Sequence, residues 1–145
     1  MPYSTELTDD CLGIVHHSRG LVTGQELLQA TIAARQLVQN TENFNYEVGD
    51  FSGASEVRVA PEELAEIVAQ DRLAAAERPH AVIMIIAPSE QAYETARQWQ
   101  EQVNDLGWTI HIAREPAEGY EWLSRHREQA RRDLRAGQKE TSPAE

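Results

Sequence analysis

The side chains most able to do chemistry gather in one segment in the first half of the chain. Gly49-Asp50-Phe51-Ser52-Gly53 places a carboxylate two residues before a hydroxyl, between two glycines. A hydrolase nucleophile elbow needs Gly-x-Ser-x-Gly, so that small residues stand two positions before and after the serine. The spacing here is Gly-x-x-Ser-Gly, and neither His111 nor His126 is placed as a base. A hydrolase-type enzyme is therefore a distant alternative.

Polar residues also occur where strands of a parallel sheet are expected to end. In such sheets, ligands bind in a crevice between the strand carboxyl ends and the helices that follow. Turn chemistry is the simpler explanation, because Asp and Ser side chains often bond nearby backbone N–H groups. Two of these residues, Ser52 and Ser55, are also candidates for phosphorylation. The candidate crevice residues are Asp50, Ser52, Ser55, Ser89 and Asp71.

Asp71 is the most unusual residue of its predicted helix. It follows Ile67 and Val68 by one turn and lies at the edge of their apolar stripe. An isolated buried charge is strongly destabilising, so the carboxylate must be paired or hydrogen-bonded. One interpretation is an acid in a pocket, with a raised pKa. The simpler interpretation is a salt bridge at the boundary of the core.

The five histidines do not form a metal-binding pattern. His16 and His17 are neighbours on a predicted strand, so their side chains point to opposite faces and cannot readily share an ion. No cysteine or carboxylate stands at ligand spacing. We predict no metal site and no cofactor, and histidines that are solvated or at an edge.

The composition limits the classes of partner. The chain has 145 residues, a formal net charge of −11 and a single cysteine. A nucleic-acid surface needs clustered Lys and Arg, and an anionic membrane repels an acidic protein, so we expect neither partner. The longest apolar run, Ala81 to Pro88, is too short for membrane insertion. With no disulfide and no apparent secretory segment, we expect a cytoplasmic protein.

Strands and helices are predicted to alternate after an N-terminal β-hairpin. The run from His80 to Ala87 has no polar alternation, which is typical of a strand buried on both faces. Thr23 and Glu26 have the spacing of a capping box, and Ser89 is predicted to cap the helix that follows it. Residues 50–55 are predicted to form a polar turn. The predicted strands are 3–7, 12–17, 44–48, 80–87 and 108–113, and the predicted helices begin near residues 24, 61, 89 and 116.

This order predicts a single α/β domain. We expect a mostly parallel sheet of about five strands, with the antiparallel hairpin at one edge and about four flanking helices. The domain is predicted to span residues 1–136. The tail, residues 137–145, has nothing apolar to bury and is predicted to be disordered.

The pattern resembles the SpoIIAA-like group of STAS-type domains, small bacterial proteins. Four short segments carry the resemblance, which covers roughly residues 3 to 124: Gly20-Leu21-Val22-Thr23-Gly24-Gln25-Glu26-Leu27-Leu28, Asp50-Phe51-Ser52-Gly53, Pro61-Glu62-Glu63-Leu64 with Asp71-Arg72, and Trp122-Leu123. The resemblance implies a five-stranded sheet, no metal and no assigned activity. Sporulation-type STAS domains carry a phosphorylated serine at the start of the second helix. This chain has Ala60-Pro61 there, and its nearest serines are in the preceding segment.

We therefore expect a non-catalytic regulatory module that acts through protein contacts. The alternative is a carrier that holds a small apolar ligand or lipid between sheet and helices. In that case Trp99, Trp108 and Trp122, with Met84 and the two Phe residues, would line the cavity, although core packing explains them equally well. The sequence leaves the oligomeric state open, and a homodimer is among the alternatives.

Overall fold

A computed structural model describes residues 3–8, 10, 12–39 and 44–141, with side chains described as far as Glu128. Its five strands form one sheet in the order β1-β2-β3-β4-β5. β1 is antiparallel to β2, and the other neighbouring strands are parallel. The strands are β1 (Tyr3–Leu7), β2 (Gly13–Thr23), β3 (Tyr46–Arg58), β4 (Val82–Ile86) and β5 (Thr109–Ala113). The predicted fold class is confirmed.

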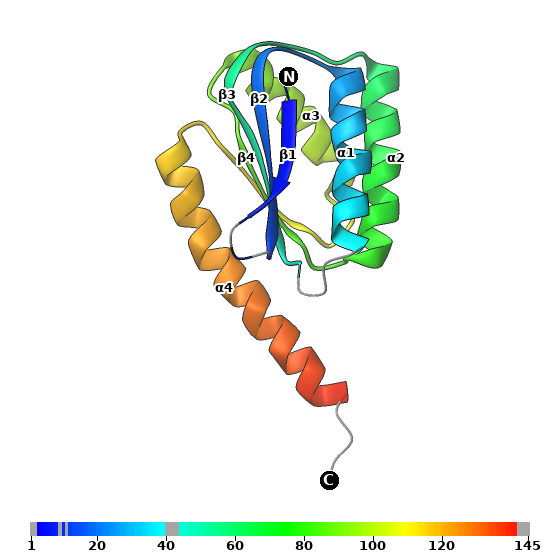
Figure 1. Ribbon diagram of the computed structural model, residues 1–145, viewed down its shortest axis with the longest axis vertical. Coiled ribbons are helices and arrows are strands. Elements are labelled where there is room, and N and C mark those ends of the chain that lie inside the picture. The colour runs from blue at the N-terminus through cyan, green and yellow to red at the C-terminus, as the bar shows by residue number, and fades with distance from the viewer. Residues whose placement is uncertain (1–2, 9, 11, 40–43, 142–145) are drawn as a thin grey trace.

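The helices divide unequally between the two faces of the sheet. They are α1 (Gly24–Gln39), α2 (Pro61–Glu77), α3 (Glu90–Val103) and α4 (Pro116–Thr141). Because the parallel strands follow one another in sequence order, right-handed crossovers place α1, α2 and α3 on the same face. Figure 1 shows these three helices on one side of the sheet and α4 alone on the other. The strand order never reverses, so the sheet lacks the reversal point that creates the usual ligand crevice.

The core has one layer on each side of β4. All five residues of this strand are buried, as its unbroken apolar run predicts. Ile83 and Ile85 face the three-helix side, while Met84 and Ile86 pack with Leu123 of α4. A Cβ atom on Gly119 would come within 2.8 Å of the Met84 sulfur, so this glycine lets α4 approach the sheet closely.

The polar turn predicted at residues 50–55 is wrong, because β3 continues through it to Arg58. β2 is also longer than predicted and ends at Thr23. The two extensions pair with each other and bury Val22 and Val57 at their far end. This mutual pairing satisfies the backbone groups of a segment whose side chains are otherwise polar. Local turn propensity is overridden by a long-range partner strand.

The helix boundaries follow the predicted caps. The Thr23 hydroxyl accepts a hydrogen bond from the Glu26 backbone N–H at 3.2 Å, and the Glu26 carboxylate accepts one from the Thr23 backbone N–H at 3.3 Å. The Ser89 side chain caps α3 by accepting from the Ala92 N–H at 3.1 Å. α4 runs to Thr141, past residue 137 at which the tail is predicted to begin.

Candidate functional site

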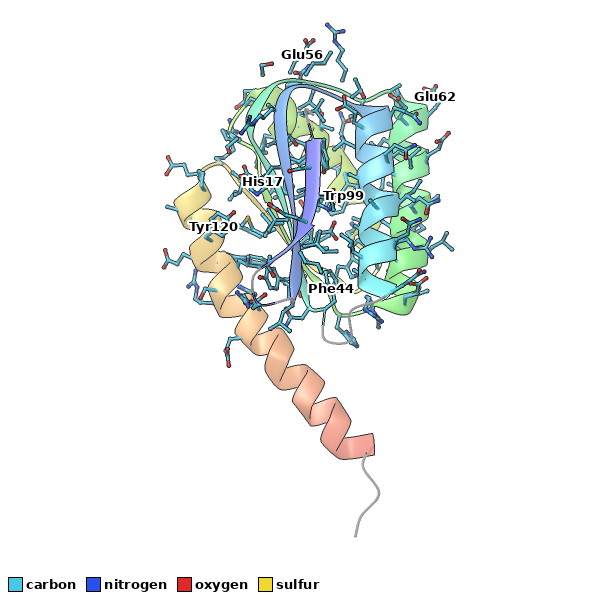
Figure 2. All side chains as sticks on the ribbon, in the orientation of Figure 1. His17, Phe44, Glu56, Glu62, Trp99 and Tyr120 are labelled. Carbon is cyan, nitrogen blue, oxygen red and sulfur yellow. The ribbon has the colours of Figure 1, made fainter. Side chains whose placement is uncertain are left out.

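A cavity of about 110 Å³ lies between the sheet and helices α1, α2 and α3. Six elements each contribute a polar or aromatic side chain with a hydrogen-bonding group to its wall. Figure 2 shows Trp99 inside the molecule, between the sheet and α1. The six residues are Tyr3 of β1, His16 of β2, Glu47 of β3, Thr31 of α1, Asp71 of α2 and Trp99 of α3.

The strand register explains why space remains at this place. Gly49 of β3 pairs with His16 on one side and with Ile85 on the other. Side chains alternate between the two faces of a strand, so all three positions face α1, α2 and α3. Gly49 contributes no side chain to this row, and a Cβ added there would meet nothing nearer than 3.5 Å. The missing side chain leaves room in the middle of the wall.

The remainder of the wall is largely apolar. Trp99 and Trp108 line the cavity, as the carrier hypothesis expects. Trp122 does not, because it lies on α4 and stacks on His111 and His126, with ring centroids 4.8 and 4.2 Å away. Met84 faces α4 as well. The apolar wall includes Leu27, Phe51, Val57, Leu64, Ile67, Ile83, Ile85, Ala92 and Ala96.

His16 is held by partners on two neighbouring strands. Its Nε2 lies 2.5 Å from Glu47 Oε1, and its Nδ1 lies 2.8 Å from the Thr5 hydroxyl. A carboxylate only accepts hydrogen bonds, so Nε2–H donates to Glu47 and, in the neutral ring, Nδ1 accepts from Thr5. His16 is 5% exposed, and the prediction of solvated or edge histidines is therefore wrong for this residue.

Asp71 is an acid in an apolar environment. Burial raises its pKa from 3.8 to about 7, and the negative charge of Glu47 acts in the same direction. The Trp99 indole N–H opposes the rise by donating to Asp71 Oδ2 at 2.7 Å. Arg72, its chain neighbour, pairs instead with Asp105 at 3.1 Å. Among the described residues Asp71 forms no salt bridge, so its surroundings match the pocket-acid interpretation.

The structure brings together only two of the five predicted site residues. Asp50 and Ser52 lie on the opposite face of the sheet, where the Ser52 hydroxyl donates to Asp50 Oδ1 at 2.6 Å. His17 Nδ1 lies 3.4 Å from the other Asp50 oxygen, and Figure 2 shows His17 on the side of the sheet that faces α4. Ser55 is exposed further along β3, and Ser89 is the α3 cap. Asp71 belongs to the interior cavity.

We call this second region the open strip, defined by Ser4, Glu6, His17, Ser18, Arg19, Asp50, Ser52 and Gly53. It is the part of the α4-side face that α4 leaves uncovered, since α4 packs on β4 and β5. Four of its polar residues contact one another: Asp50 accepts from Ser52 and contacts His17, which also lies 3.7 Å from Glu6. The Ser18 hydroxyl is buried and has no hydrogen-bond partner among the described residues. The strip is therefore a solvated polar surface.

Sequence reasoning missed Tyr3, His16 and Glu47 as site residues. Tyr3 and Thr5 are two residues apart on β1, as are Ile14 and His16 on β2, so each pair faces the same side of the sheet. This spacing places polar groups on the side that faces the helices. The spacing is visible in the sequence, but the cross-strand pairing that gathers the three residues is not. In the described part of the chain, no three His, Cys, Asp or Glu side chains are grouped to hold a metal ion. No helix described here is long and apolar enough to cross a membrane.

Comparison with known proteins supports the fold. No family model matches the sequence, and no curated protein matches it either. The chain is similar to the crystal structure of an uncharacterized DUF3478-family protein with a SpoIIAA-like fold from Shewanella loihica PV-4, with 12% identity and a TM-score of 0.54 over 83% of this chain and 91% of that one. It is also similar to the anti-sigma factor antagonist SpoIIAA in its unphosphorylated form, with 13% identity and a TM-score of 0.52 over 84% and 97% of the two chains. The predicted resemblance is confirmed at the level of the fold: this protein has a SpoIIAA-like α/β fold.

Proposed function

We propose that this protein is a non-catalytic binding module that holds a small molecule in the cavity between the sheet and helices α1, α2 and α3. The observation that carries the proposal is the cavity itself, an apolar space into which a few polar groups converge from different elements. Ligand sites are typically built in this way, with apolar walls for affinity and sparse polar groups for orientation. Asp71 lines the same cavity, and its raised pKa is also typical of residues at functional sites.

The volume limits the size of the ligand. An engineered apolar cavity of roughly 150 Å³ binds benzene, which has six heavy atoms. At about 110 Å³, this cavity is suited to a short alkyl chain or a small ring. A long acyl chain exceeds this volume and would extend beyond the cavity. The carrier alternative therefore narrows to ligands of about six heavy atoms or fewer.

One arrangement in the wall resembles part of a catalytic site. Thr5, His16 and Glu47 form a hydroxyl–imidazole–carboxylate row, the order of groups in a serine-hydrolase triad. Thr5 does not line the cavity, however, so a bound molecule does not meet its hydroxyl. We assign the row to holding the His16 ring in one tautomer and orientation.

Filling the cavity is expected to abolish ligand binding. In a 1H–15N NMR titration with 1-butanol, we expect shifts of the residues that line the cavity, including the indole N–H of Trp99. Gly49→Val should remove these shifts, because its side chain occupies the space left beside Ile85. Ser55→Val adds the same side chain to an exposed position of β3 and should bind as the wild type does. Equal shifts in all three proteins would contradict the proposal.

A protein partner is the second candidate function, and one observation favours it. The SpoIIAA structure to which this fold is similar is that of an anti-sigma factor antagonist, a regulatory role performed by binding. The open strip, with Asp50 and Ser52 at its centre, is the surface that α4 leaves free for contact. A second copy of the chain, which would give a homodimer, is among the partners that this surface could take.

A photo-crosslinking residue at position 52 tests this second candidate. If a partner docks on the open strip, we expect one protein to be crosslinked from position 52 and not from position 124, an exposed serine on α4. Ser52→Ala removes the hydroxyl that donates to Asp50, so less of the partner protein should be recovered in a pull-down with this variant. Mass spectrometry of the same material should find phosphate on Ser52 or Ser55 if either is a switch. Equal crosslinking from both positions would contradict docking at the strip.

A further inference from the structure

The charge inside the cavity is one-sided. Two carboxylates line it, Glu47 and Asp71, and they are close enough for the charge of Glu47 to raise the pKa of Asp71. No Lys or Arg side chain lines the same cavity. His16 is the one basic group in its wall, and it is already engaged by Glu47 and Thr5. Among the described residues, the cavity wall therefore has two carboxylates and no Lys or Arg side chain to neutralise them.

Each carboxylate has an oxygen to spare. Glu47 bonds His16 through Oε1, and Asp71 bonds Trp99 through Oδ2. Among the described residues, no hydrogen bond reaches Glu47 Oε2, Asp71 Oδ1 or the Tyr3 hydroxyl. Burial raises the pKa of Tyr3, so its hydroxyl stays protonated and its oxygen is available as an acceptor. Three acceptor atoms on residues that line the cavity therefore have no donor in the described part of the chain.

Aromatic rings complete the environment. Tyr3, Phe51, Trp99 and Trp108 all line the cavity. A cation near the face of an aromatic ring is stabilised by the negative potential of that face, most strongly with Trp and when desolvated. An organic ammonium ion donates up to three hydrogen bonds and carries an alkyl part that suits the apolar wall.

We propose that the ligand of this cavity is a small primary alkylamine, bound as its ammonium ion between Glu47 and Asp71. This inference rests on the proposed function, since it assigns the chemistry of the same cavity. Desolvating an ammonium ion is costly, and two carboxylates with spare acceptors are the groups that offset that cost. The size of the cavity sets the alkyl part at about four or five carbons.

Other charged groups lie near Asp71 and belong to its electrostatic environment. Tyr3, His16 and Glu47 share its cavity. A smaller neighbouring cavity, which Asp71 and Glu47 also line, is bordered by Arg35, Glu77 and Arg78. Arg35 is engaged there by Glu77 at 2.7 Å and by Gln70 at 3.2 Å. These contacts engage its two terminal nitrogens, while its Nε is buried with no hydrogen-bond partner among the described residues.

Three probes of equal size but different charge test the inference. NMR titrations at pH 8 with n-butylammonium, 1-butanol and butyrate should give the tightest binding for n-butylammonium, at least about tenfold tighter than for 1-butanol, and none for butyrate. Protonation of Asp71 at pH 5 should weaken the binding of n-butylammonium about tenfold or more and leave the affinity for 1-butanol unchanged. Asp71→Asn should remove most of the preference for the ammonium ion. Asp105→Asn, a matched change at an exposed carboxylate, should keep it.

The outcomes separate this inference from the proposed function. If 1-butanol binds and n-butylammonium binds no better, the cavity is a ligand site but the amine assignment is overturned. The same follows if Asp71→Asn keeps the full preference for the ammonium ion. If none of the three probes shifts the cavity residues, the proposed function itself is contradicted.

Discussion

Replacing Asp71 with Asn is expected to stabilise the protein at pH 8 by on the order of 4 kcal/mol and to have little effect near pH 4. The folded-state pKa of Asp71 is about 7, whereas its ordinary value is 3.8. Well below pH 3.8 the carboxyl is protonated in both the folded and unfolded states, so Asp and Asn are nearly equivalent. As the pH rises towards 7, the unfolded chain releases its proton first and the folded state is progressively disfavoured, by about 1.4 kcal/mol per pH unit.

Urea denaturation of both proteins from pH 4 to pH 9 measures this difference. The difference in the free energy of unfolding should grow between pH 4 and pH 7 and level off above that. Asp105→Asn is the control, because Asp105 is exposed and its pKa is lowered by the Arg72 hydrogen bond. Its small effect should have the opposite sign, since the folded state there favours the charged form. A difference between Asp71→Asn and wild type that does not change with pH would show that Asp71 is not a buried acid.

Removing His16 is expected to have the second large effect. His16→Leu leaves the Glu47 carboxylate without its partner beside the negative charge of Asp71. Breaking a buried pair on one side typically costs 3 to 5 kcal/mol, and the 25% exposure of the Glu47 side chain points to a cost of about 2 to 3 kcal/mol. The double variant His16→Leu/Glu47→Leu should recover most of this loss, because no unpaired charge then remains.

The chain offers a matched control at the next position. His17 is on the opposite face of β2 and its side chain is 46% exposed, so His17→Leu should change the free energy of unfolding by no more than about 0.5 kcal/mol. Thermal or urea unfolding at pH 7 measures all four proteins. If His16→Leu and His17→Leu cost the same, or if the double variant is less stable than His16→Leu, the proposed role of the pair is wrong.

The sequence predicts the elements whose determinants are local. The apolar run of β4 and the caps at Thr23 and Ser89 depend on neighbouring residues, and each is found as expected. The polar stretch at residues 50–55 has the composition of a turn, yet it is strand because β2 pairs along its length. A polar segment whose backbone is satisfied by a distant strand has no local feature that distinguishes it from a turn.

The candidate site is harder to predict for the same physical reason. Asp71 can be identified because a carboxylate beside an apolar helical stripe conflicts with its surroundings. The row of His16, Gly49 and Ile85 depends on the register of three strands, which the sequence does not specify. Asp50 points to the face of β3 opposite the cavity and Ser89 caps α3, so neither residue lines the cavity. Whether Asp50, Ser52, Ser55 and Ser89 take part in binding stays a prediction.

The space beside Gly49 is expected to admit a small molecule, and xenon bound in a crystal is the sharpest probe of that space. Xenon enters apolar cavities through dispersion forces and needs no particular ligand chemistry. We expect a single strong xenon peak among Phe51, Ile85 and Trp99 in the wild type, and none in Gly49→Val crystals. A wild-type crystal with no xenon there, and with the wall side chains in contact across the space, would show that the protein has no ligand cavity at this place.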